Sequence, residues 1–218
     1  IGLLPHWDAL YCTTGDSRAL SASIAHGRAY GIYGIFYRDA STRRMPRFSD
    51  YPTAYSDSED MVSGGIRWEF AHHPNAGFLP WLLTAERFFL EVMQANAWAC
   101  FYTQNPDGGD VARLYSSQTR GRAWRFRTLA AVAAVSPSGD PFAVDCRTNL
   151  AANLANWKTV HVDANTPATG LVGIYDDKEG GQAGFQHSIF ENLFLTATLG
   201  WAWDIEPGGL NRSPGLTT

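Results

Sequence analysis

The sequence predicts a mainly α-helical domain built from antiparallel helical hairpins, with a small β-hairpin in its first long loop. Apolar residues recur at spacings of three and four along seven segments, which is the period of an amphipathic helix. Short turns and long loops alternate between these segments, and a short connection makes two consecutive helices antiparallel neighbours. The pattern therefore indicates three hairpins followed by a lone seventh helix, in a chain whose 218 residues suffice for one folded domain.

Turn and capping signals delimit the hairpins. Short turns are expected at 14–17, 84–86 and 136–140, where small or polar residues favour a reversal and can cap the following helix. Pro74 and Pro141 suit a first helical turn, because a proline there loses no hydrogen bond. The predicted helices cover residues 4–13, 18–30, 73–83, 87–104, 117–135, 141–160 and 185–201.

The long loops are predicted to gather at one end of the array. Turns inside antiparallel hairpins lie at one end, and the connections between hairpins lie at the other. The glycine-rich and aromatic segment 31–37 is expected to form the small β-hairpin with 45–48, and further long loops cover 105–115 and 163–184. Because long loops in compact domains commonly carry function, this end is the predicted working face.

The starts of the third, fifth and seventh helices are polar and are expected at the same end. They carry His72 and His73, then Gln118, Arg122 and Arg125 on one helical face, and then Gln186, His187 and Glu191. Ligand binding is one interpretation. The other is that the histidines cap and pack while the arginines form a solvated face. His187 and Glu191 have a spacing that can bind a metal, but no third ligand accompanies them, so we expect no metal and no cofactor.

Several classes of function are disfavoured. A formal net charge of -4 and a pI near 5.8 argue against nucleic-acid binding. No segment has the length of a membrane span, and no signal peptide is visible, which leaves the compartment open. The sequence contains no glycine-rich phosphate loop, nucleophile elbow or paired-cysteine spacing, which disfavours nucleotide-dependent enzymes and serine hydrolases.

The hairpin order and the short-turn signatures Thr14-Gly15-Asp16 and Ser138-Gly139-Asp140 resemble the α/α-toroid domains of carbohydrate-active proteins, both polysaccharide lyases and glycoside hydrolases. The resemblance implies a cleft at one end of the toroid that binds a polysaccharide or oligosaccharide. A hydrolase would need two carboxylates across the cleft, for which Asp39 and Glu191 are candidates.

For a lyase, the resemblance implies three roles. His73 or His72 is the candidate base, Arg122 or Arg38 neutralises the substrate carboxylate, and Tyr37, Tyr51 or Tyr175 donates a proton to the leaving oxygen. The expected catalytic residues are His73, His72, Tyr37 and Arg122. The expected substrate-binding residues are Arg38, Asp39, Tyr51, Trp68, Gln118, Trp124, Tyr175, Gln186 and His187.

A non-catalytic structural or binding module of a larger assembly is the alternative function. A toroid commonly has about twelve helices, and only seven are predicted here, so we expect 1–218 to be a single domain from a longer chain. The partner would then be the rest of the same polypeptide or a neighbouring subunit. An enzyme should lose activity while staying folded when His73, Arg122 or Trp124 is substituted, whereas a scaffold should lose assembly or stability.

Overall fold

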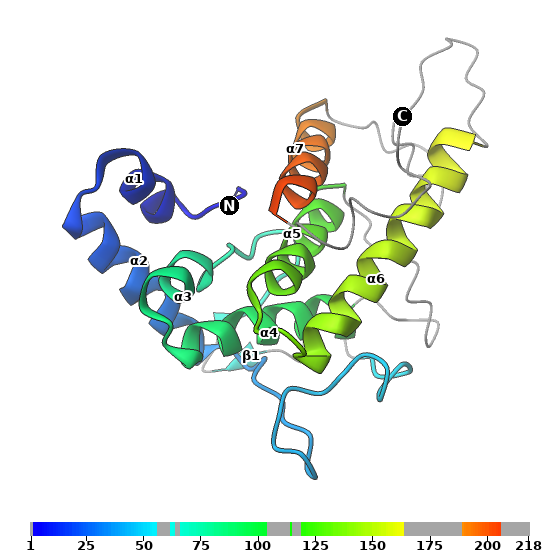
Figure 1. Cartoon of the computed structure of the whole chain (residues 1–218), viewed down its shortest axis with the longest axis horizontal. Coiled ribbons are helices and arrows are strands. Elements are labelled where there is room, and N and C mark those ends of the chain that lie inside the picture. Colours follow the sequence, from blue (N-terminus) through cyan, green and yellow to red (C-terminus); the bar gives the residue numbers. More distant parts are fainter. Residues whose placement is uncertain are drawn as a thin grey trace.

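The computed structural model describes residues 2–55, 62–63, 66–103, 114, 119–163 and 189–205. The chain is mainly helical, as predicted, with seven α-helices in these ranges (Figure 1). The helices are α1 (His6–Thr14), α2 (Ser17–Ala29), α3 (Phe78–Thr84), α4 (Arg87–Tyr102), α5 (Thr119–Val135), α6 (Pro141–Trp157) and α7 (Ile189–Ile205). The shorter elements are the 3-10 turn η1 (Tyr30–Ile32), the strands β1 (Val62–Ser63) and β2 (Ile66–Arg67), and the π-helical turn η3 (Lys158–Asp163).

The three short turns lie where the sequence predicts them, and each joins two helices that pack against each other. Asp16 caps α2 by accepting a hydrogen bond from the backbone amide of Arg18 at 2.8 Å, and Asp140 caps α6 in the same way. The α3 helix begins at Phe78 rather than near His73. Gly77, its N-cap, has a φ of 90°, a left-handed conformation that glycine adopts without strain.

The predicted strand pair between 31–37 and 45–48 does not form. Residues 30–32 make the 3-10 turn η1, and the described two-residue strands β1 and β2 pair elsewhere, with Val62 opposite Arg67. The apolar residues that suggested strands are used for packing instead, since Ile35, Met45 and Phe48 are all buried in the core.

The predicted placement of every long loop at one end is wrong for the first loop. Arg28, at the end of α2, lies 3.3 Å from Glu86 in the turn between α3 and α4, so the first loop starts beside a short turn. The α3 helix has only seven residues, which lets α2 reach the start of α4. Gly27 permits this approach, because a Cβ atom there would lie 2.9 Å from the Phe89 ring.

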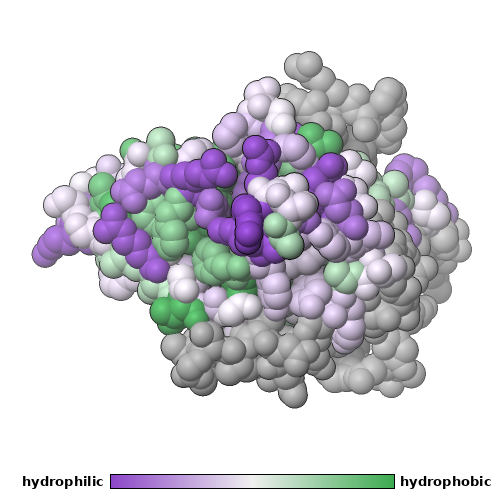
Figure 2. Space-filling model, turned by 90° about the horizontal axis from the view of Figure 1, so that it is seen from below, coloured by the Kyte–Doolittle hydropathy of each residue, from purple (hydrophilic) through white to green (hydrophobic). Residues whose placement is uncertain are grey.

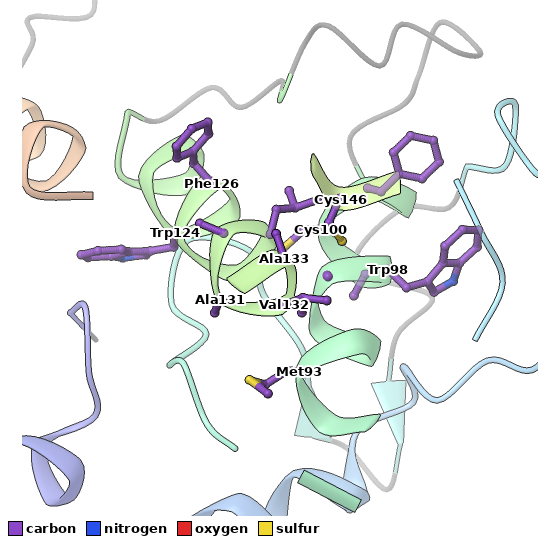
Figure 3. Packing of buried hydrophobic residues seen from close by; sticks show 14 of the residues in the cluster. Met93, Trp98, Cys100, Trp124, Phe126, Ala131, Val132, Ala133 and Cys146 are labelled. Carbon is purple, nitrogen blue, oxygen red and sulfur yellow. The ribbon is translucent and has the colours of Figure 1, made fainter. Parts of the chain in front are cut away.

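The α5 helix is the centre of the molecule and packs against α4, α6 and α7 (Figure 1). It is buried on all sides over most of its length, so Arg122 and Arg125 do not form the solvated face that the spacing allowed. Alanines on α4 and α5 let the two helices approach closely, and larger side chains such as Trp98, Trp124 and Phe126 fill the space around them (Figure 3). None of the described helices is both long and apolar enough to span a membrane.

Candidate functional site

The residues predicted to form one site are divided between different places along α5. His72 lies at its first turn and His73 and Trp68 lie near its middle, whereas Arg38, Asp39 and Tyr51 lie in the first long loop, which crosses to the turn that follows α5. Gln118, Tyr175, Gln186 and His187 lie outside the described residues, and the side chain of Glu191 does too. The described side chains therefore form two separate polar clusters.

His73 is buried, and both of its ring nitrogens are engaged. Nδ1 lies 2.8 Å from the Phe70 carbonyl oxygen, which can only accept, so Nδ1 carries the proton. Nε2 then accepts from the Thr128 hydroxyl at 2.9 Å. Burial, reinforced by the positive charge of Arg127, holds the pKa of His73 well below 6.5. His73 is therefore a neutral histidine inside the core, with no exposed nitrogen that could reach a polysaccharide.

Two arginines of α5 lie around this histidine. Arg127 donates to the His73 carbonyl oxygen at 2.8 Å and to the Gly2 carbonyl oxygen at 2.5 Å, which fixes the N-terminal residues against α5. Arg125 lies 4.4 Å from the centre of the Phe70 ring and donates to the Thr103 hydroxyl. Burial lowers the pKa of each arginine to about 10, which still leaves both charged at neutral pH. Arg122 is buried beside them on the same helix.

His72 lies at the surface and connects an acidic side chain to a basic one. Its Nδ1 is hydrogen-bonded to the Glu69 carboxylate, and its Nε2 accepts from the Arg120 guanidinium at 2.9 Å. A guanidinium only donates, so Nε2 holds the lone pair and Nδ1 the proton. The side chain of His72 is 60% exposed. Of the two predicted candidate bases, His72 is the one that solvent and ligands can reach.

The two predicted tryptophans are core residues. Trp68 is 1% exposed and donates from its indole nitrogen to Asn96 at 2.8 Å, while its ring lies 5.0 Å from that of His73. Trp124, also 1% exposed, packs on Phe194. Neither ring face is available to stack on a sugar in this conformation. Tyr37 is partly buried and packs on Tyr102 at the end of α4.

The second cluster surrounds a groove of about 710 Å³ between the first loop, the start of α4 and the turn between α5 and α6. Arg38 forms an ion pair with Glu91 of α4 at 2.7 Å. Asp39 accepts from the hydroxyls of Ser41 and Tyr51 and from the amides of Thr42 and Ser41. These hydrogen bonds hold the pKa of the Asp39 carboxyl well below its usual range.

Sequence reasoning missed Glu69 and Thr128, the partners of the two histidines. Glu69 stands three residues before His72, a spacing that could have indicated the pair, whereas Thr128 is distant in sequence and gives no local signal. Across the residues that the structure describes, no three His, Cys, Asp or Glu side chains come together as a possible metal site. In comparisons with known proteins, no family model matches the chain, and no curated protein or solved structure is significantly similar to it.

Proposed function

We propose that this chain is a carbohydrate-active domain of α/α-toroid type that binds an acidic polysaccharide and cleaves it by β-elimination. The observation that carries the proposal is a hydrogen-bonded triplet of Glu69, His72 and Arg120, in which the His72 side chain is exposed and the other two are partly buried. It places a neutral imidazole directly beside a cation. Helical hairpins around a central α5 are in keeping with part of a toroid, and closure of the ring would need further helices.

The proposed reaction uses each of these three side chains. A uronate carboxylate bound by Arg120 would draw the guanidinium away from His72 and free the Nε2 lone pair. Pairing with Arg120 also makes the proton on the neighbouring C5 easier to remove. His72 takes that proton, and Glu69 stabilises the imidazolium that forms.

The electrons of the broken C5–H bond form the C4–C5 double bond, and the glycosidic O4 leaves. His72 can return its proton to O4, so the proton balance closes within the site.

The test is an assay for unsaturated products, which absorb in the ultraviolet, on polygalacturonate, alginate and hyaluronate. His72→Gln should lower the rate by about 10²–10⁴-fold, the usual contribution of a general base, with an unchanged melting temperature because the side chain is exposed. His6→Gln, at another exposed histidine, is the matched control. Reducing ends without ultraviolet absorbance would indicate hydrolysis instead. If neither product formed on any of these polymers, the proposal would fail.

A non-catalytic module of a larger assembly is the second candidate. It is favoured by the outer face of α7, where Leu193 is 62% exposed and Trp203 is 43% exposed. A contiguous exposed apolar patch marks a surface that packs on another domain or subunit, and these two side chains would contribute to one on α7. Light scattering across a concentration series tests it, since a strictly monomeric chain with lyase activity would exclude a purely structural role.

A further inference from the structure

We propose that the groove beside the first loop is a second binding site, in which Arg43 and Arg44 bind the acidic groups of an oligosaccharide at a distance from the reacting bond. The inference deepens the proposed function and rests on it for the nature of the polymer. The shared chemistry is a row of sugar rings that carry carboxylates or sulfates. Binding in the groove does not require that the polymer be cleaved.

The groove is lined by charged side chains of both signs. Five are arginines, namely Arg38, Arg43, Arg44, Arg47 and Arg87, and four are carboxylates, namely Asp39, Asp50, Glu91 and Asp140. Glu91 pairs with two of them, Arg38 at 2.7 Å and Arg87 at 3.1 Å, and Asp145 pairs with Arg47. Arg43 and Arg44 are exposed, and their guanidinium groups have no hydrogen bond or ion pair with the described part of the chain. Their binding capacity is therefore available to an anion.

The loop that carries these two arginines is held by hydrogen bonds. Asp39 closes it with three hydrogen bonds, from the Ser41 amide at 2.9 Å, the Ser41 hydroxyl at 2.6 Å and the Thr42 amide at 2.7 Å. The Arg43 amide bonds back to the Asp39 carbonyl oxygen. A ligand that binds to an ordered loop loses less conformational entropy than one that must order it.

Arg43 has an unusual backbone conformation. Its φ is 59°, in the left-handed region that costs a non-glycine residue about 1–2 kcal/mol. Glycine would adopt this conformation without strain. An arginine held there, with its side chain exposed and unpaired, is more readily explained by binding than by stability.

Aromatic side chains from neighbouring segments of the chain line a second hollow. This more open hollow of about 380 Å³ is lined by Gly31, Gly34, Phe36 and Phe88, and two of its lining residues, Tyr37 and Phe88, are next in sequence to Arg38 and Arg87 of the groove. The rings of Phe36 and Phe88 are nearly parallel. Figure 2 shows this side of the molecule from below, with hydrophobic residues in green beside hydrophilic residues in purple. Apolar ring faces followed by arginines suit an extended acidic sugar chain, whose rings stack while its charged groups pair.

The test measures binding to the full chain carrying His72→Gln, so that the probe stays intact. The probes are oligogalacturonate, a heparin-derived oligosaccharide and a neutral cello-oligosaccharide of equal length. Calorimetry measures the affinity of the protein for each. Arg43→Gly combined with Arg44→Ala should weaken the acidic probes by about tenfold or more, the loss expected for two charge-assisted contacts. Arg18→Ala with Lys158→Ala, which removes the same charge from exposed positions outside the groove, should change binding by less than about twofold.

The outcomes distinguish the two proposals. Arginine-dependent binding of an acidic probe without any cleavage by the unmodified chain would retain the groove and reject the lyase. If the unmodified chain cleaved a polymer, and the groove variant and the charge control bound the acidic probes equally well, the lyase would be retained and the groove rejected. Equal affinity for the neutral probe, or no binding of either acidic probe, would overturn the groove inference. Binding of oligogalacturonate would show that carboxylates suffice, whereas binding of the heparin-derived probe alone would show that sulfates are needed, because heparin carries both groups.

Discussion

Replacing Asp145 by alanine should destabilise the protein and loosen the loop that frames the groove. The Asp145 side chain is 8% exposed and accepts three hydrogen bonds, from the Arg47 guanidinium at 2.8 Å, the Ser49 amide at 3.0 Å and the Ser49 hydroxyl at 2.9 Å. Removing one partner of a buried ion pair costs about 3–5 kcal/mol. Arg47 is 38% exposed and can turn to water, so we expect a smaller loss of about 2–3 kcal/mol. For a chain of this length, that lowers the melting temperature by about 4–12 °C.

Thermal and urea unfolding measure this loss. Thr148→Ala is the matched control, because within the described residues that exposed hydroxyl bonds only to a carbonyl of its own helix, and its removal should change stability by less than about 0.5 kcal/mol. Trypsin gives a second readout, since a loosened loop should be cut faster after its arginines. If Asp145→Ala matched the control in both measurements, the carboxylate would not hold the loop. Its buried apolar residues, Met45 and Phe48, would then suffice.

Three further predictions follow from the core. Ser23→Ala removes a hydroxyl that donates to the buried Asp8 carboxylate at 2.6 Å. It should cost about 1.5–3 kcal/mol in urea unfolding at pH 7, and less as acid protonates Asp8, whose pKa burial raises above 3.8. The low pKa of His73 means that the unfolded chain binds a proton more readily than the folded chain. Stability should therefore fall by up to about 1.4 kcal/mol per pH unit as the pH drops below 6.5, and His73→Gln should remove that slope. Gly77→Ala should cost more than Gly15→Ala in thermal melts. Both glycines have positive φ, but a Cβ at Gly77 would lie 2.8 Å from a carbonyl oxygen, whereas Gly15 has open space.

The helices were predictable because their signals are local. Apolar spacing and the capping aspartates Asp16 and Asp140 act within a few residues, and they place six of the seven helix starts within about four residues. The start of α3 was missed by five residues, since the helix waits for the left-handed Gly77 rather than for Pro74. Local signals also mispredicted the strand pair of the first loop, because β-branched and aromatic residues suit a buried loop as well as a strand.

The loop that frames the groove was beyond sequence reasoning for a different reason. Its contacts join residues far apart in the chain, as when Arg47 meets Asp145 and Phe48 packs on Phe142. The burial of α5 was hidden in the same way. Four arginines in one helix suggest a solvated face. Three of them are buried because α4, α6 and α7 pack around α5.

The positions of the two clusters set a condition on any shared ligand. Arg120 lies in the first turn of α5, and the groove is lined by the turn that follows α5. At about 1.5 Å per residue, the 17 residues of this helix separate them by about 25 Å. A small ligand cannot contact both, whereas a polymer can. If both proposals hold, Arg43→Gly with Arg44→Ala should leave the cleavage of short oligosaccharides unchanged and raise KM only for long chains. An equal effect on short and long substrates would mean that the arginines act through the fold rather than by holding the polymer.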